Sequence, residues 1–168
     1  MLGAYSNKEC KVDIISQAWA VISMINDKDV KNELLTCMEC AYNYLVDKEN
    51  MVVRLLYPPF AKPKNNPGYI KAYVPGTREN GGQYTHGATW FSKAYFELKN
   101  KEKGIEILKL LNPIYHSDTK EKADKYMVEP YVVAADIYSN PEHPGRGGWT
   151  WYTGSSAWMY KIIEDYLN

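Results

Sequence analysis

The sequence has 168 residues, the length of a single domain, and 45% of them are hydrophobic and 24% charged. This composition excludes an intrinsically disordered chain. Twenty Lys and Arg balance twenty Asp and Glu, which argues against a nucleic-acid binder or a protein of anionic membranes, because both need an excess of positive charge. The unusual figure is the aromatic content of 14%, and such an excess favours a binding cleft.

Cysteine usage and the opening residues indicate a compartment. Three cysteines in a chain of this length provide no disulfide framework and fit a reducing environment. Residues 1–10 show no basic region followed by an apolar run, and no apolar stretch approaches the length of a membrane span. We therefore expect a cytoplasmic protein that contacts neither a membrane nor nucleic acid.

Apolar residues at helical spacing predict two helices in the first third of the chain. Their stripes lie within residues 12–25 and 34–45, separated by a polar break at 26–29. Two antiparallel helices joined by a turn are the simplest arrangement. The short apolar run at 51–56 is compatible with an extended segment.

The next segments alternate between loops and helices. Residues 57–85 are too rich in Pro and Gly for a helix and too long for a passive connector, so they predict an ordered loop over a site. Helical spacing resumes at 91–98 and 105–111, and a second irregular segment covers 129–149. The last helix is predicted to begin at Thr153, a good N-cap residue, and to pack on two sides. The pattern predicts an all-α fold of the α/α-toroid type.

The densest polar stretch runs from residue 78 to residue 86, with a cation, a carboxylate, two amides, two hydroxyls and an imidazole. A glycine pair at 81–82 would let backbone approach a ligand closely. Such convergent polar groups suit a sugar or a phosphate. The alternative is a hydrogen-bonded turn before a helix. The candidate residues are Arg78, Glu79, Tyr84 and His86.

A second candidate lies where the last helix begins. Free backbone N–H groups and the helix dipole make an anion site there, and the Thr153 hydroxyl adds a donor. Trp149 and Trp151 offer ring faces for a sugar. The alternative is that Thr153 only caps the helix and that both tryptophans belong to the core.

Other polar residues carry weaker signals. Cys37 and Cys40 have a metal-like spacing, but they lie inside a predicted amphipathic helix without a second pair, so we expect core packing and no metal. Glu129 and Asp136 flank an apolar run and could face a site or bond to local backbone. No nucleophile elbow, P-loop or dinucleotide fingerprint is present.

Several long segments of the sequence resemble the glycoside hydrolase family 94 phosphorylases. This family includes cellobiose, chitobiose and 1,2-β-oligoglucan phosphorylases and the C-terminal part of cyclic β-1,2-glucan synthase. The sequences of two segments, VVAADIY and RGGWTWYTGS, resemble the β-1,2-glucan-related members more than cellobiose phosphorylase. The resemblance covers essentially the whole chain and rests on ECKVDIISQAW (9–19), GYIKAYVPGTRENGGQYTHGATW (68–90), LLNPIYH (110–116), KYMVEPYVVAADIY (125–138) and GRGGWTWYTGSSAWMY (145–160).

The resemblance implies a partial (α/α)6 barrel, with residues 1–168 as the C-terminal segment of the catalytic domain. It also implies phosphate-dependent cleavage of a β-linked glucan or disaccharide with inversion, so inorganic phosphate is a co-substrate and no cofactor is needed. By the matching motifs, the phosphate-binding residues are His86, Thr153 and Gly154, and Arg78 and Glu79 contact the acceptor sugar. Candidate sugar-lining residues are Tyr84, Trp149 and Trp151.

Some parts of the family pattern have no match in the sequence. The family's general acid is an Asp on an earlier barrel segment, and the N-terminal β-sandwich and first part of the barrel are also unmatched. We therefore expect a C-terminal fragment that is inactive alone and that self-associates or joins the missing N-terminal part. The alternative is a non-enzymatic remnant that binds carbohydrate or phosphate.

Overall fold

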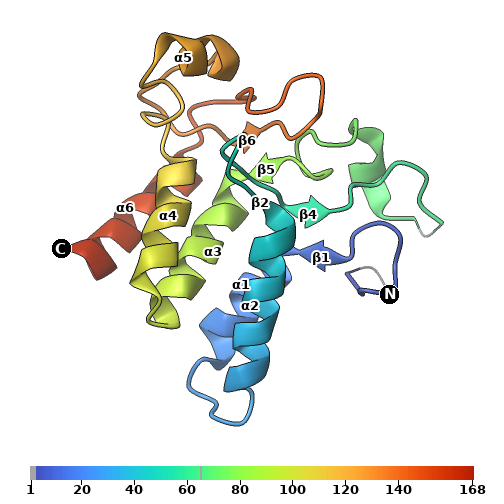
Figure 1. Cartoon of the computed structure of the whole chain (residues 1–168), viewed down its shortest axis with the longest axis vertical. Coiled ribbons are helices and arrows are strands. Elements are labelled where there is room, and N and C mark those ends of the chain that lie inside the picture. The colour runs from blue at the N-terminus through green and yellow to red at the C-terminus, as the bar shows by residue number, and fades with distance from the viewer. Residues whose placement is uncertain (1–2, 65) are drawn as a thin grey trace.

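The computed structural model describes residues 3–64 and 66–168. Five of its helices gather in one half of the molecule, and the short strands, the long loops and a small sixth helix lie above one end of them (Figure 1). The helices are α1 (Ile14–Met24), α2 (Lys31–Leu45), α3 (Thr85–Glu97), α4 (Lys101–Leu111), α5 (Lys120–Tyr126) and α6 (Thr153–Leu167). A 3-10 helix, η1 (Gly68–Ala72), interrupts the first long loop.

Three antiparallel pairs of two-residue strands tie the loops to the helix ends. The pairs are β1 (Val12–Asp13) with β4 (Leu56–Tyr57), β2 (Val46–Asp47) with β3 (Val52–Val53), and β5 (Gln83–Tyr84) with β6 (Asp136–Ile137). Because β1 leads directly into α1 and β5 into α3, these pairs fix where two helices begin. The fold is therefore helix-rich with small strands, and the all-α prediction is correct only in part.

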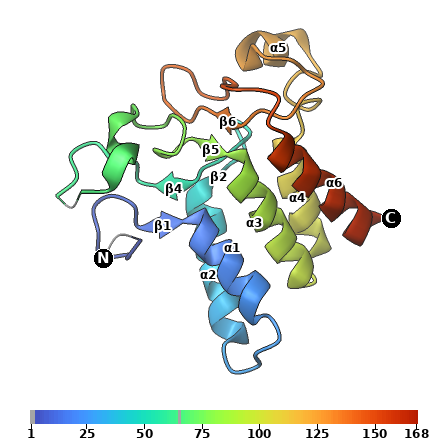
Figure 2. The ribbon, with the colours of Figure 1, turned by 180° about the vertical axis from the view of Figure 1, so that it is seen from behind.

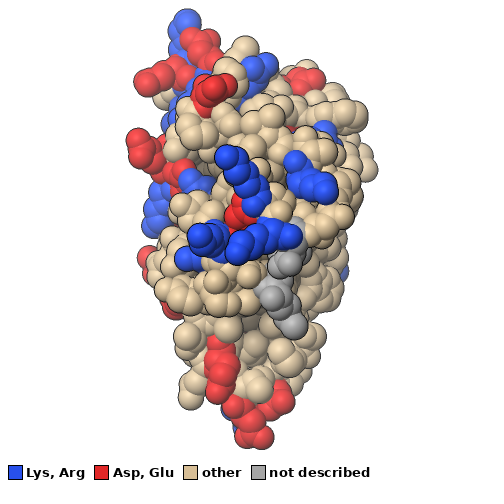
Figure 3. All heavy atoms as spheres, turned by 90° about the vertical axis from the view of Figure 1, so that its right-hand side faces the viewer, with Lys and Arg blue, Asp and Glu red and all other residues tan. Residues whose placement is uncertain are grey.

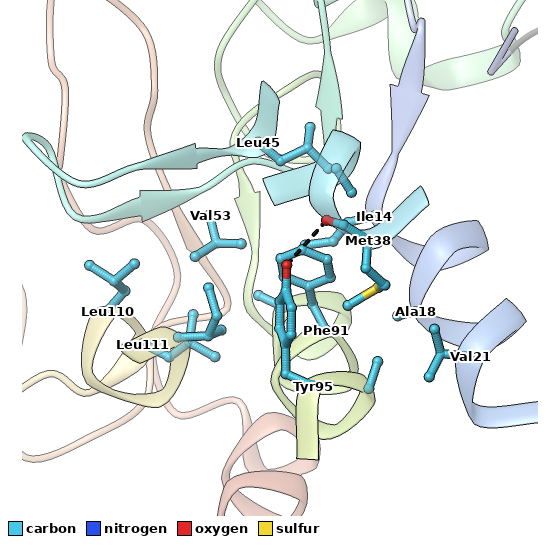
Figure 4. Close-up of a cluster of buried hydrophobic side chains, with 14 of the residues drawn as sticks. Ile14, Ala18, Val21, Met38, Leu45, Val53, Phe91, Tyr95, Leu110 and Leu111 are labelled. Atoms are coloured by element: carbon cyan, nitrogen blue, oxygen red, sulfur yellow. Dashed lines mark hydrogen bonds between the residues drawn. The ribbon is translucent and has the colours of Figure 1, made fainter. Parts of the chain in front are cut away.

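Helix α3 occupies the centre of the helical half, with contacts to α1, α4 and α6 (Figure 2). Its polar start is buried as well as its apolar stripe, because Thr85 and Thr89 are fully covered. Phe91 and Tyr95 of α3 meet Met38 of α2 in the main core, where the Tyr95 hydroxyl donates to the Met38 carbonyl oxygen at 3.1 Å (Figure 4). The core thus joins the first helix pair to the second.

The helix predictions are confirmed in type but not in every boundary. Helices α1 and α2 fall within or close to the predicted ranges, whereas α3 begins at Thr85, six residues before the predicted start at 91. Asp13 caps α1, with its Oδ1 accepting hydrogen bonds from the N–H groups of Ile15 and Ser16 at 2.9 and 3.1 Å. The run at 51–56 is partly extended, as β3 and the start of β4.

Within the described chain, helix α6 packs on one side, and the second side that the sequence predicts to be packed has no partner among the described residues. Its buried residues are Ser155, Met159 and Ile162, and the helix it lies against is α3. Tyr160 and Ile163 stay 67% and 40% exposed, because they point away from α3. Helix α6 therefore presents an uncovered apolar face at the edge of the molecule.

Two further expectations from the sequence are wrong. Helix α6 begins at Thr153, as predicted, but Thr153 is not its cap, because Tyr152 occupies the capping position and makes no side-chain cap bond. Cys37 and Cys40 are exposed on α2 rather than packed in the core, since the buried stripe of that helix runs through Leu34, Met38 and Ala41. The partial (α/α)6 barrel stays a prediction.

Gly104 controls how closely α4 approaches α3. A Cβ atom added there would lie 2.7 Å from Cε2 of Phe96, whose ring is stacked on Tyr166 of α6 at 5.0 Å between ring centroids. The Ser92 hydroxyl also donates to the Gly104 carbonyl oxygen at 2.8 Å. The glycine is required by contact with a ring that is packed on both sides.

We predict that Gly104→Ala lowers the free energy of unfolding by about 1–3 kcal/mol, the usual cost of overpacking. In an uncrowded helix the same change would raise it by about 0.5–1 kcal/mol. Urea denaturation measures the difference, with Asn43→Ala on the exposed side of α2 as the control for helix propensity. A Gly104→Ala chain more stable than the parent would contradict the packing argument.

Candidate functional site

The polar stretch 78–86 divides into structural residues and residues that face a pocket. Asn80 is fully buried and bonds to the N–H and carbonyl groups of Phe60 at 2.7 and 2.8 Å. Gln83 is also fully buried, where its Oε1 accepts from the Val53 N–H at 2.9 Å and its Nε2 donates to the Thr85 hydroxyl at 3.0 Å. These side chains hold the loop, as the alternative reading of a hydrogen-bonded turn predicts for them.

The glycine pair serves the loop itself, not the approach of a ligand. Gly81 has a φ of +87°, which favours glycine, and an added Cβ would lie 2.9 Å from Cβ of Pro59. A Cβ on Gly82 would lie 2.8 Å from the Arg78 carbonyl oxygen. The expectation that these glycines admit a ligand is therefore wrong, because protein atoms already fill both positions.

Arg78 and Glu79 line a small pocket together with Tyr84, Ala135, Asp136 and Tyr152. The Arg78 guanidinium lies between two rings, with its central carbon 5.4 Å from the Tyr73 centroid and 5.2 Å from the Trp149 centroid. The Arg78 Nε and Glu79 Oε2 atoms are 3.7 Å apart, and both are buried without a hydrogen bond to any described residue. The two residues form an ion pair in which each side chain keeps one buried atom without a hydrogen bond to the described residues.

His86 lies beside the start of α6. A Cβ atom on Gly154 would lie 3.1 Å from Cε1 and 3.4 Å from Nδ1 of the His86 ring, so the glycine leaves the edge of the imidazole open to the first turn of the helix. The first N–H groups of a helix have no acceptor inside the helix, and the dipole makes this end attractive to anions. The imidazole and the helix start are thus brought together.

Of the three aromatic residues predicted to line a sugar site, two lie at the Arg78 pocket and one lies away from it. Tyr84 stacks near His86, with centroids 6.1 Å apart, and also lines the pocket of Arg78, so it stands between the two groups. Trp149 covers the Arg78 guanidinium, whereas the Trp151 ring packs against Tyr131 at 6.2 Å. Both tryptophans are about two-thirds exposed, at 65% and 64%, so the alternative that they are core residues is wrong.

Sequence reasoning missed Tyr152 and left Asp136 undecided. Tyr152 lines the pocket from the residue before α6. Asp136 reaches it because β6 pairs with β5, which sets Asp136 opposite Tyr84. The only sequence signal for Asp136 is a carboxylate at the end of an apolar run, which does not reveal the strand that it pairs with.

A second, wider hollow lies on the face that holds the N-terminal segment and the loop after β4, where Lys and Arg gather around an acidic side chain (Figure 3). Lys8, Glu9, Phe60 and Lys62 are among its lining residues. Glu9 already accepts hydrogen bonds from the N–H groups of Ala61 and Lys62, both at 2.8 Å. Among the described residues, none of the buried side-chain atoms without a hydrogen-bond partner belongs to this hollow. Three of them belong to Arg78, Glu79 and Asp136, which favours the Arg78 pocket as the site.

No group of three or more His, Cys, Asp or Glu residues in the described parts of the chain could hold a metal ion. Within the same residues, none of the helices has the length and apolar character needed to cross a membrane.

The family comparison agrees with the motifs of the sequence. The model for the glycosyl hydrolase 94 superfamily catalytic domain matches residues 1–168. The chain belongs to this family.

Individual relatives refine this placement. The chain is 48% identical over 167 residues to the cyclic beta-(1,2)-glucan synthase NdvB of Rhizobium meliloti, covering 99% of this chain and 6% of that protein. It is 26% identical to the solabiose phosphorylase of Paenibacillus borealis and to the N,N'-diacetylchitobiose phosphorylase of Vibrio furnissii, covering 99% of this chain and 21% and 20% of those proteins. The family 94 chain therefore spans between about one-sixteenth and one-fifth of the length of these relatives.

The structure shows where the site residues implied by the family resemblance lie. Arg78, Glu79 and Tyr84 share one pocket, and His86 adjoins Gly154 at the start of α6. Thr153 is the first residue of that helix. Their assignments to phosphate and to the acceptor sugar stay predictions.

The pKa of His86 gives a test of this arrangement. Burial among the rings of Tyr84, Trp90 and Trp158 disfavours the imidazolium, so the pKa lies below the ordinary value of about 6.5. As the pH falls through 6.5, the folded chain then binds fewer protons than the unfolded chain. The free energy of unfolding therefore decreases on acidification.

We predict that the His86 ring protons, followed by NMR, titrate with a midpoint below 6.5. The free energy of unfolding should also fall more steeply between pH 7 and pH 5 in the parent than in His86→Gln. A midpoint above 6.5 in the absence of anions would contradict the burial of the ring.

Proposed function

We propose that this chain supplies the phosphate and acceptor-sugar sides of the active site in an inverting β-glucoside phosphorylase. The main support for the proposal is the proximity of His86 to Gly154, which places an imidazole beside the anion-attracting start of α6. The chain also belongs to the glycosyl hydrolase 94 family. Phosphate would bind between the His86 ring, the Thr153 hydroxyl and the first N–H groups of α6. Arg78 and Glu79 would bind the acceptor sugar.

Tyr84 adjoins both proposed binding sites, because its ring stacks on His86 and it also lines the pocket of Arg78. Phosphate and the acceptor sugar would therefore bind close to each other. In phosphorolysis with inversion, phosphate attacks the anomeric carbon from the face opposite the leaving sugar. Phosphate carries its own negative charge, so no carboxylate base is needed on its side, and the donors at α6 neutralise and orient it. The leaving sugar is held by Arg78 and Glu79 while its oxygen receives a proton from a general acid.

The 48% identity to a cyclic beta-(1,2)-glucan synthase favours a β-1,2-linked glucan as the substrate class. We propose glucose as the sugar of the acceptor site, because the other relatives, named for solabiose and diacetylchitobiose, are less similar at 26% identity. Phosphate is a co-substrate in this scheme, and no resident cofactor is required.

Phosphate binding tests the proposal directly. We predict that phosphate added to the 168-residue chain raises the pKa of His86, because a nearby anion favours the imidazolium. His86→Gln should weaken phosphate binding about tenfold, the effect of removing one hydrogen bond to a charged group. NMR titration measures both, with chloride at equal ionic strength as the salt control.

The matched variant is His143→Gln, which changes an exposed histidine in the second long loop. It should leave phosphate affinity unchanged. Equal phosphate affinity in His86→Gln and the parent would refute this site.

We also propose that catalysis requires a general acid from a segment outside these 168 residues, since none of the sequence matches the family's acid motif. General acid catalysis contributes about a hundredfold or more. The chain alone should therefore release no measurable glucose 1-phosphate from β-1,2-, β-1,3- or β-1,4-glucobiose in a coupled assay. Phosphate-dependent turnover by a purified monomer would contradict the assignment of the acid.

The exposed face of α6, with Tyr160 and Ile163, supports a neighbour for this chain. We propose that the rest of a family 94 domain or a second copy of the chain is that neighbour.

A further inference from the structure

Asp136 is a buried carboxylate with one oxygen that has no protein partner. The residue is 4% exposed, and its Oδ1 accepts a hydrogen bond from the Trp149 N–H at 3.0 Å. Its Oδ2 is buried and makes no hydrogen bond in the described parts of the chain. Burial raises the pKa of this carboxyl, and the Trp149 N–H and the Arg78 charge act in the opposite direction. An unpaired oxygen in such a place has a free-energy cost that a bound ligand can remove.

The position of the carboxylate is fixed from two sides. The pairing of β5 with β6 sets Asp136 opposite Tyr84, and the Gly148 N–H donates to the Asp136 carbonyl oxygen at 2.9 Å. A Cβ atom on Gly148 would lie 2.3 Å from Oδ2, so only a glycine leaves room for the carboxylate. The Asp136 carboxylate is therefore packed against the Gly148 backbone.

Asp136 lines the same pocket as two residues that also carry unpaired atoms. Asp136, Arg78 and Glu79 line it together, and the Arg78 Nε and the Glu79 Oε2 are also buried without hydrogen bonds to the described residues. The pocket thus offers two charged acceptors and one charged donor. A ligand that satisfies all three must donate at least two hydrogen bonds and accept one.

Charge decides which ligand this is. The pocket has two carboxylates and one guanidinium, so its net charge is negative. It therefore repels an anion and does not suit phosphate. Neighbouring hydroxyl groups on a neutral sugar donate to carboxylates and also accept from a guanidinium. The charges of the pocket therefore suit a hydroxyl group of a sugar, while the start of α6 beside His86 suits the anion.

We propose that Asp136 is a sugar-binding residue whose Oδ2 accepts a hydrogen bond from one hydroxyl group of the pyranose held by Arg78 and Glu79. This inference rests on the proposed function and adds a third side chain to its acceptor site. It also gives that site a rule of selectivity, because the sugar must carry a free hydroxyl group at the position that meets Asp136.

Asp136→Asn is the variant that separates binding from structure. The amide keeps an oxygen for the Trp149 N–H but replaces the free acceptor by an NH2 donor. We expect the Kd for D-glucose, measured by NMR titration of the 168-residue chain, to rise about tenfold or more, as for a hydrogen bond to a charged group. Phosphate affinity should change less than twofold.

The matched control is Asp124→Asn on α5, an exposed residue paired with Lys120 at 2.6 Å. It should leave both affinities unchanged. The series of monodeoxyglucoses supplies the readout that a structural role would not move. One member should bind the parent more weakly than glucose does, and this difference should vanish in Asp136→Asn.

A second measurement needs no variant. In the parent chain, the carboxyl 13C resonance of Asp136 should shift on addition of glucose and stay in place on addition of phosphate. An unmoved resonance in the presence of bound glucose would overturn the inference, as would equal glucose affinity in Asp136→Asn and the parent. In both cases the proposed function would stand, whereas failure of the parent chain to bind glucose would overturn both.

Discussion

The pairing of β5 with β6 is the constraint on which the candidate site depends. Two residues on each strand suffice to set Tyr84 opposite Asp136, and so join segments more than fifty positions apart. The N–H of Thr85 extends the ladder by donating to the Ala135 carbonyl oxygen at 3.0 Å. On the other side of β6, residues 146–149 bond to it through the N–H groups of Tyr138 and Gly148. Three segments of loop thereby become one ordered layer.

Helix α3 makes this layer rigid, because it begins where β5 ends. Gln83 links the layer to β3 through its bond to the Val53 N–H, and the buried Thr85 starts the helix beneath it. His86 follows directly, so its ring is placed by the first turn of a helix that also packs against α6. The anion side and the sugar side are therefore held by the same short stretch of chain, and a shift of α3 would move both.

The sequence indicates the helices better than it indicates the site. Regular apolar spacing predicts α1 and α2, but the start of α3 is hidden because Thr85, Gly87 and Thr89 are poor helix formers that are buried by their neighbours. Strands of two residues are too short to show the alternation that marks a strand. The small strands are therefore invisible to pattern analysis, although they determine which loops meet.

Residue type alone also cannot divide the polar cluster. Asn80 and Gln83 have the same chemical character as ligand-binding amides, yet both are bonded to backbone groups of the protein. Asp136 follows an apolar run and is found only when its strand partner is known. Family resemblance identifies Arg78, Glu79 and His86 through motif matching, whereas Asp136 and Tyr152 emerge from the geometry of the pocket.

The position of Arg78 between Tyr73 and Trp149 has a consequence for the thermodynamics of recognition. A free arginine side chain loses about 1.5–2 kcal/mol of rotamer entropy when it is ordered. Because the two rings already confine the guanidinium, most of this entropy is lost during folding and not when a ligand arrives. The enthalpy of the hydrogen bonds that Arg78 makes is then available to affinity with little ordering to offset it.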